Sequence, residues 1–598
     1  AEAAADFEQV VRLTPDMTQA VFNRGVVYEA LRRYPEALAD YDEAIKLGVE
    51  GPDVFVKRAN VHKVLEQYEE ALADYDTAIV LNVKDADVYA DRAACCFALG
   101  RYENAVSDYD DAIELNPQQT RFYYGRGLAY RSQDAYEQAL ADFDRVIEQE
   151  PGNAAAFKER GGVYEALEQY EEAVADYGKV IGLEPEKATN YLKRGQVYEA
   201  LDRVEEAVVD YDEALRLSPE YAAAYYERGK LYRAHKQLPE ALEDFERAIR
   251  LDPQNAAAFT ERGSTLKALG QIDAALADYN EALRLNPQDA AAYFNRGTIY
   301  QKRNGIEEAL TDYAASLSLE PDNGAAYYNR GRIYQSLARY EEALADFDEA
   351  ICRHLQGAAE YTDRGDVYRE LGRFNEALLD YDKALQRAPN SAAIYFKRGL
   401  TYQMSGRSKE ALADFNGAIE IDPKNAASYY HRGQVYEALS QIEDALADYY
   451  KAIYLDPGSV KAFSARGQIY RNLGRLDEAL ADYDELVRID SEDAAIYYYR
   501  GRTNQDLGRI SEAVDDYNSA IDLQIDGAGA YYWRATISQA RGRHAEALAD
   551  YDEAIGRGIE GPDAFVRRAN VHKVLEQYEE ALADYDAAIE LQVKDADV

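Results

Sequence analysis

Cysteine, methionine and tryptophan are scarce in this chain of 598 residues, which holds three Cys, two Met and one Trp. The cysteines are Cys95, Cys96 and Cys352, two of them adjacent and the third distant. This arrangement is neither a disulfide framework nor the spacing of a zinc site. Cysteine usage therefore excludes a disulfide-stapled fold and leaves the redox compartment open.

Histidine is also rare, and no catalytic set can be assembled from the sequence. The six histidines are His62, His235, His354, His431, His544 and His572. They stand too far apart in the sequence to converge on one site. The chain has no phosphate-binding loop, no dinucleotide fingerprint after a strand and no nucleophile elbow. We therefore expect no enzyme activity, no cofactor and no metal site.

Long apolar runs are missing, and positive charge is in deficit. No stretch approaches the roughly 20 apolar residues that a membrane span needs, so membrane insertion is not expected. The 111 acidic side chains outnumber the 67 basic ones, for a formal charge of -44. Such a field repels phosphates, which argues against nucleic acid and anionic membranes as partners and favours basic ones. The alternative interpretation is that acidic side chains on exposed helix faces keep a long molecule soluble.

One repeated pattern dominates what is present. An arginine recurs every 34 residues, seventeen times without a slip, from Arg24 to Arg568. The next residue is always small, Gly in thirteen repeats and Ala in four. Thirteen residues after each Arg comes Ala, and four beyond it an aromatic, from Tyr41 to Tyr585. A fixed period of this length predicts one solenoid of helical units in place of several globular domains.

The spacings inside the repeat predict a pair of helices. Small residues such as Gly25 and Ala37 allow two antiparallel helices to approach closely, and the aromatics fill the space beside the contact. All fifteen prolines lie between the predicted helices or at their first positions, where proline is tolerated. We expect an all-α solenoid of antiparallel helix pairs.

The segment 292–321, AYFNRGTIYQKRNGIEEALTDYAASLSLEP, resembles the tetratricopeptide repeat family in its aromatic, small, Tyr, Ala, aromatic and Pro positions. The resemblance covers the whole chain, with Tyr or Phe where the family often has Trp, and Arg before the Gly. It implies a right-handed superhelix with first helices on the concave face and second helices outside, and it implies protein or peptide partners. In this register residues 1–17 form a partial repeat, 18–595 hold seventeen repeats and 596–598 begin another.

An aspartate stands sixteen residues after every one of these arginines. In an antiparallel pair the two positions lie near the same level, so the sequence predicts a series of contacts that we call the Arg–Asp ladder. A partly buried Arg is normally paired with a carboxylate, so the interpretation is structural. Examples of the predicted pairs are Arg24 with Asp40, Arg296 with Asp312, and Arg568 with Asp584. The recurring Asp-Tyr-Asp is not a metal motif, because residues two apart on a helix point about 200° apart.

The predicted concave face carries an aromatic two residues before the arginine in nine of the seventeen repeats. Nearby inward positions add glutamines and an arginine, a mixture suited to stacking and hydrogen bonding. The expected ligand groove comprises Phe22, Tyr124, Tyr226, Phe294, Tyr328, Arg332, Gln335, Phe396, Gln403, Tyr430, Gln434, Tyr498 and Tyr532. The alternative is that the aromatics pack against neighbouring first helices. The family's Lys and Asn clamp for terminal carboxylates is not reproduced, because Asn23 is followed by Lys57 and Asp91.

A longer period overlies the short one. Residues 51–88 return at 561–598 with five differences in 38 positions, an offset of 510 residues or fifteen repeats. Neither end resembles the polar capping unit that a repeat array needs. Two functions stay open: a non-enzymatic scaffold presenting a concave surface to protein or peptide partners, and a filament or spacer continued end to end by copies of itself. The first would suit the cytoplasm, the second the cell surface or exterior.

Overall fold

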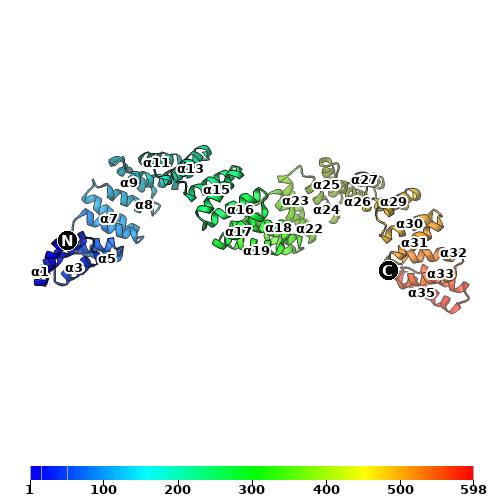
Figure 1. Ribbon diagram of the computed structural model, residues 1–598. Coiled ribbons are helices and arrows are strands. Elements are labelled where there is room, and N and C mark those ends of the chain that lie inside the picture. Colours follow the sequence, from blue (N-terminus) through cyan, green and yellow to red (C-terminus); the bar gives the residue numbers. More distant parts are fainter. Residues whose placement is uncertain (1, 15–16, 50, 597–598) are drawn as a thin grey trace. The chain divides into compact units, whose positions relative to one another are not determined.

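The computed structural model describes residues 2–14, 17–49 and 51–596, and every regular element in these ranges is an α-helix. Residues 1, 15, 16, 50, 597 and 598 lie outside the described part, and with them Pro15 and the end of the expected last partial repeat. The chain forms two units, Ala1–Ile299 and Tyr300–Val598. In each unit, helices of similar length follow one another along the chain (Figure 1).

The described residues of the first unit form seventeen complete helices and most of an eighteenth. They are α1 (Glu2–Leu13), α2 (Thr18–Ala30), α3 (Tyr34–Lys46), α4 (Asp53–Val64), α5 (Tyr68–Val80), α6 (Ala86–Ala98), α7 (Tyr102–Leu115), α8 (Thr120–Arg131), α9 (Tyr136–Gln149), α10 (Ala154–Ala166), α11 (Tyr170–Leu183), α12 (Ala188–Ala200), α13 (Val204–Leu217), α14 (Ala222–Ala234), α15 (Leu238–Leu251), α16 (Ala256–Ala268), α17 (Ile272–Leu285) and α18 (Ala290–Lys302). The last of these runs through the boundary between the units.

The second unit continues the same alternation of first and second helices. They are α19 (Ile306–Leu319), α20 (Gly324–Ser336), α21 (Tyr340–Cys352), α22 (Ala358–Glu370), α23 (Phe374–Arg387), α24 (Ala392–Met404), α25 (Ser408–Ile421), α26 (Ala426–Ala438), α27 (Ile442–Leu455), α28 (Val460–Asn472), α29 (Leu476–Ile489), α30 (Ala494–Asp506), α31 (Ile510–Asp522), α32 (Gly529–Ala540), α33 (His544–Gly556), α34 (Asp563–Val574) and α35 (Tyr578–Ala596). The expected boundary at 595–596 falls inside α35, whereas the equivalent helix α5 ends at Val80.

Consecutive helices pack as antiparallel pairs, an even-numbered first helix with the odd-numbered second helix that follows it. First helices also contact the second helix before them, as α4 contacts α3 and α22 contacts α21. Successive first helices touch as well, for example α20 with α22 and α22 with α24. The predicted all-α solenoid of helix pairs is confirmed.

Each pair closes where a small residue of the first helix meets an aromatic ring of the second. Tyr211 is fully buried, and a Cβ added to Gly195 would lie 2.6 Å from its ring. Contacts this short are not available to a side chain, so glycine sets the distance between the two helices. Ala207 and Ala214 fill the remaining space and are also fully buried.

The turn inside each pair has one conformation throughout the chain. The residue eight positions after each ladder arginine has a positive φ in all seventeen repeats, for example 57° at Glu168 and 73° at Gly100. The N–H of Gln169 then donates to the carbonyl of Tyr164 at 2.8 Å. This is the Schellman-type end of an α-helix, and it sends the chain directly into the second helix.

Candidate functional site

Outside the repeat of Arg296, the structure places each arginine of the Arg–Asp ladder against the aspartate sixteen residues later. Arg160 donates from Nε and Nη2 to the two carboxylate oxygens of Asp176, at 2.8 and 2.6 Å. Asp176 is only 3% exposed. The same contact recurs from one end of the described chain to the other, as shown by Arg24 with Asp40 at 2.7 Å and Arg568 with Asp584 at 2.6 Å.

One predicted pair of the ladder stays a prediction. Arg296 belongs to the first unit and Asp312 to the second, so their contact would cross the boundary between the units.

The remaining nitrogen of the ladder arginine reaches the preceding repeat. Arg160 Nη1 donates to Asp144 Oδ1 at 2.5 Å, while Arg126 holds Asp142, the other carboxylate of that Asp-X-Asp. The two aspartates therefore serve different arginines. Arg160 therefore joins its own helix pair to the one before it, and Arg58, Arg92 and Arg568 do the same.

Aromatic rings cover both sides of the same guanidinium. The Arg160 carbon Cζ lies 5.5 Å from the ring centre of Phe157 and 5.8 Å from that of Tyr164. The hydrogen bonds that Arg160 donates to Asp176 raise the pKa of Arg160, so its charge is permanent. A planar guanidinium that is stacked on rings and held by two hydrogen bonds to one carboxylate has a structural role. It has no nitrogen left to take part in a reaction.

Another surface of the chain varies from repeat to repeat, and we call it the first-helix face. It comprises the residues two and one before, and two and five after, each ladder arginine. The nine aromatics of the expected groove belong to it. None of them is exposed: eight are partly buried, and Tyr532 is buried at 8% exposure.

These aromatics rest on the core rings of their own repeats. The ring centres of Phe22 and Tyr41 are 5.9 Å apart, and those of Tyr124 and Phe143 are 6.0 Å apart. The packing alternative therefore describes most of their surface. What the face offers a partner comes mainly from the polar side chains beside them.

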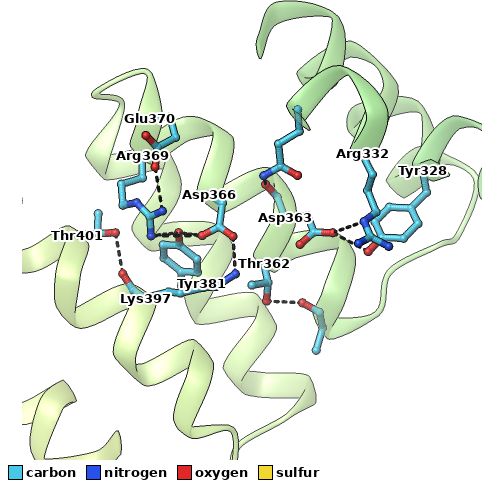
Figure 2. Close-up of polar contacts among 12 residues, drawn as sticks. Tyr328, Arg332, Thr362, Asp363, Asp366, Arg369, Glu370, Tyr381, Lys397 and Thr401 are labelled. Atoms are coloured by element: carbon cyan, nitrogen blue, oxygen red, sulfur yellow. Dashed lines mark hydrogen bonds and ion pairs between the residues drawn. The ribbon is translucent and has the colours of Figure 1, made fainter. Parts of the chain in front are cut away.

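Figure 2 shows such polar side chains across α20, α22 and α24. Tyr328 Oη donates to Asp363 Oδ2 at 2.7 Å, and Arg332 Nε lies 3.6 Å from the same oxygen. Gln335 Nε2 donates to the Asp363 carbonyl at 3.5 Å. Three expected groove residues are thus brought together by a residue of the next first helix, and the Arg332 side chain remains 55% exposed.

A buried carboxylate lies at the centre of the neighbouring cluster in Figure 2. Asp366, 8% exposed, accepts hydrogen bonds from Tyr381 Oη at 2.7 Å and Lys397 Nζ at 2.5 Å. Arg369 Nη1 lies 3.3 Å from Asp366 Oδ1. Burial, and then the charge of Asp366, raise the pKa of Tyr381, which keeps its hydroxyl protonated as a donor. The carboxylate is neutralised on every side, so the cluster fixes three helices and is not a reactive site.

A second group of expected groove residues also meets. Gln403 Nε2 donates to Gln434 Oε1 at 3.2 Å, and Gln434 Nε2 donates to Tyr430 Oη at 2.8 Å. Phe396 packs on the ring of His431, with centres 5.6 Å apart. The other expected groove residues lie repeats away from these two groups.

Models of one protein family match most of the sequence. A model described as a tetratricopeptide repeat matches residues 1–53, 56–120, 97–154, 124–188, 192–256, 295–359 and 498–565. A model described as a TPR repeat matches residues 263–304, 365–406, 404–440 and 467–508. The chain belongs to the tetratricopeptide repeat family. Proteins of this family are generally non-catalytic scaffolds that are typical of protein–protein interaction.

Solved TPR structures resemble parts of the chain. YrrB, described as a TPR protein with an unusual peptide-binding site, is 28% identical over 31% of this chain and 97% of its own, with a TM-score of 0.30. MamA is 26% identical over 28% of this chain and 91% of its own, with a TM-score of 0.27. A chain of the APC/C hetero-tetramer Cut9-Hcn1 is 14% identical over 83% of this chain and 98% of its own, with a TM-score of 0.34. No curated protein matches the sequence.

Metal and membrane chemistry find no support in the described part of this TPR chain. No group of three or more His, Cys, Asp or Glu there could hold a metal ion, and no helix there is long and apolar enough to cross a bilayer. Cys96 is buried, and burial raises its pKa to about 11, far from that of a reactive thiolate.

Sequence reasoning missed the charged positions that link successive first helices of the TPR array. The residue five after a ladder arginine often meets the residue one before the next, as Lys63 Nζ meets Asp91 Oδ1 at 2.8 Å. The signal was available as a recurring 28-residue spacing between basic and acidic side chains. The contact of Arg332 with Asp363 also links successive first helices, but it spans 31 residues and falls outside that spacing.

Proposed function

We propose that this chain is a non-enzymatic scaffold that binds an extended protein or peptide segment along the first-helix face. The observation that carries the proposal is the contrast between a constant interior and a varied face. The ladder arginine and aspartate never change, whereas the residue one before the arginine is Asn23, then Lys57, then Asp91. A surface that varies from repeat to repeat is what selective recognition of an irregular partner requires.

Several polar side chains of the first-helix face are fixed by hydrogen bonds and ion pairs, which supports the same proposal. Asp363 fixes the Tyr328 hydroxyl and contacts Arg332, so two potential contact groups are oriented before any partner arrives. Preorganised groups lose less conformational entropy on binding than free side chains do. The exposed part of Arg332 can then contact a partner without rearrangement of the helices.

Site-specific photo-crosslinking tests the proposal. Peptides selected from a random display library against the full chain are offered to two variants, one carrying the photo-reactive residue at Arg332 on α20 and one at Leu379 on α23. The two sites are matched in exposure, 55% for the Arg332 side chain and 59% for Leu379. We expect saturable crosslinking at Arg332 and little at Leu379. Equal crosslinking at both sites would refute the proposal.

The filament or spacer is the alternative, and the 510-residue period favours it. The two copies of the repeated segment make matching contacts, because Tyr75 Oη donates to Asn60 at 2.6 Å and Tyr585 Oη donates to Asn570 at 2.8 Å. Electron microscopy of the protein over a range of concentrations distinguishes the two functions. Fibres that lengthen with concentration support the filament, and discrete particles at every concentration exclude it.

A further inference from the structure

Basic side chains on the first-helix face are matched by carboxylates in much of the chain. Lys63 pairs with Asp91, Arg131 with Glu159, and Lys397 with Asp366. These acids stand on the next or preceding first helix, so neighbouring repeats neutralise one another. A basic side chain that lacks this match would be left able to bind an external anion.

The match breaks down on α28, α30, α32 and α34. From Ser464 to Lys573, the positions of the first-helix face include no Asp or Glu. They do include four basic residues, which are Arg471, Arg502, Arg567 and Lys573. The position one before the ladder arginine is an acid in five of the other thirteen repeats, whereas here it is Ala465, Tyr499, Trp533 and Arg567. The nearest acids stand at the edges of the face, at Asp506 and Asp563.

The guanidinium groups accordingly find poor partners. Arg502 lies over the ring of Trp533, with Cζ 3.6 Å from the ring centre, and its buried Nε has no hydrogen-bond partner among the described residues. Arg471 Nε reaches Asp506 only at 3.6 Å. Arg567 Nε donates to the Tyr532 hydroxyl at 3.0 Å, a neutral acceptor. A buried donor without a partner, such as Arg502 Nε, is costly, and the exposed Arg567 can donate to a ligand carboxylate.

A cavity opens beside these groups. It has a volume of about 460 Å³, and its walls include Trp533, Ile537, Ala540 and Arg567. One part of the wall is apolar and another is cationic, so the cavity suits an apolar side chain flanked by negative charge. The chain's single tryptophan lies against it.

We propose that this part of the first-helix face binds an acidic peptide segment, with its carboxylates on Arg502 and Arg567 and a flanking apolar side chain in the cavity against Trp533. The inference rests on the proposed function and names the ligand class of that face. A peptide is favoured over a nucleic acid because the formal charge of -44 repels a continuous polyanion far more than a few carboxylates.

Trp533 supplies the measurement, because it is the only tryptophan and reports on this site alone. Three blocked octapeptides are titrated into the full chain: one with a Glu-Leu-Glu-Leu core, one with Gln in place of Glu, and one with Lys in place of Glu. The expected result is a saturable change in Trp533 emission with the Glu peptide, and binding about tenfold or more weaker for the other two.

Variants assign the contact to the named residues. Arg502→Gln and Arg567→Gln should each weaken binding of the Glu peptide by about tenfold, since each removes a charge-assisted hydrogen bond. Lys230→Gln is the matched control, because Lys230 on the first-helix face of α14 already pairs with Glu227 of its own helix. It should leave the affinity unchanged. Circular dichroism of each variant verifies that the helices are intact.

Several results would overturn the inference. They are equal binding of the Gln or Lys peptide, unchanged affinity in both arginine variants, or an oligonucleotide that shifts Trp533 emission where the Glu peptide does not. Absence of binding by all three peptides would also overturn it. The proposed function is decided separately, by crosslinking at Arg332, so the two can fail independently.

Discussion

At the scale of single residues, the ladder arginine makes the most important contacts for holding the repeats together. Arg160 holds one carboxylate of its own repeat and one of the repeat before, and it lies between two aromatic rings. Lysine could supply the charge but neither the fork of donors nor the flat faces. The recurrence of this one residue is therefore explained by geometry, and no catalytic role is needed.

Replacing a ladder arginine should destabilise its repeat strongly. Arg160→Met leaves Asp176 buried without its partner, and breaking a buried pair in this way costs about 3–5 kcal/mol. Hydrogen exchange of α10 and α11 by mass spectrometry measures the loss locally. Arg145→Met is the control, because Arg145 is 43% exposed and lies 3.6 Å from Glu148. Equal exchange in the two variants would contradict the role of the ladder.

The double variant separates charge from packing. Adding Asp176→Leu to Arg160→Met removes the unpaired carboxylate, so part of the lost protection in α10 and α11 should return.

The buried tyrosines should make the folded chain unstable at alkaline pH. Burial raises the pKa of Tyr109 and of Tyr279 from the ordinary value of 10 to about 12. A raised pKa means that their contribution to stability is complete below pH 10 and is lost as the pH rises from 10 towards 12. Helical circular dichroism and tyrosinate absorbance should change together in this range. Tyrosinate formation by these residues in a chain that keeps its helices would contradict the account.

At the scale of the helix pair, the turn holds one residue in the left-handed backbone conformation. Glycine occupies it at Gly270, whereas Lys236 and Glu168 adopt a positive φ with a side chain. Non-glycine residues pay a conformational penalty there. The turn is retained because the hydrogen bond that follows it fixes the start of the second helix.

Exchanging residues at this turn should move stability in opposite directions. Lys236→Gly relieves the strained φ of 62° and is expected to stabilise α14 and α15 by about 0.5–1 kcal/mol. Gly270→Lys introduces the strain and should destabilise α16 and α17 by a similar amount. Hydrogen exchange of the two pairs measures both. Shifts of the same sign would show that the turn conformation does not limit stability.

A second element-scale prediction concerns the ring above the ladder arginine. Most repeats have Tyr four residues after the arginine, but the third has Cys96, and a cavity of about 320 Å³ lies beside Arg92 and Arg101. Cys96→Tyr should fill it and stack on Arg101, as Tyr198 stacks on Arg203 with 4.8 Å between cation and ring centre. We expect a gain of about 1 kcal/mol in α6 and α7. Faster exchange there would mean that the site cannot take the ring.

At the scale of the whole molecule, the constant features were predictable and the varied contacts were not. The helix pairs follow from small residues such as Gly195 and from the 34-residue period, which are local properties of the sequence. The contact of Arg332 with Asp363 depends on the angle between successive first helices, which no local spacing reveals. The same holds for Arg502 over Trp533. The expected groove stays a prediction, and the aromatics on which it relied are largely covered.

The separation of constant positions from varied positions in the repeats bears on function. A linear array without a single core is stabilised by each repeat and its neighbours, so first-helix residues can vary without loss of the fold. The constant ladder and turns stabilise the array, while the varied positions are left to select a partner. The scaffold proposal is therefore tested by the place where a partner binds. The affinity of the partner matters less.

The hydrogen-exchange footprint of a selected peptide on the full chain tests this most directly. The account predicts that the peptide slows exchange in consecutive first helices, such as α20, α22 and α24, and leaves α21, α23 and α25 nearly unchanged. Protection concentrated in the second helices, or none at saturating peptide, would contradict it.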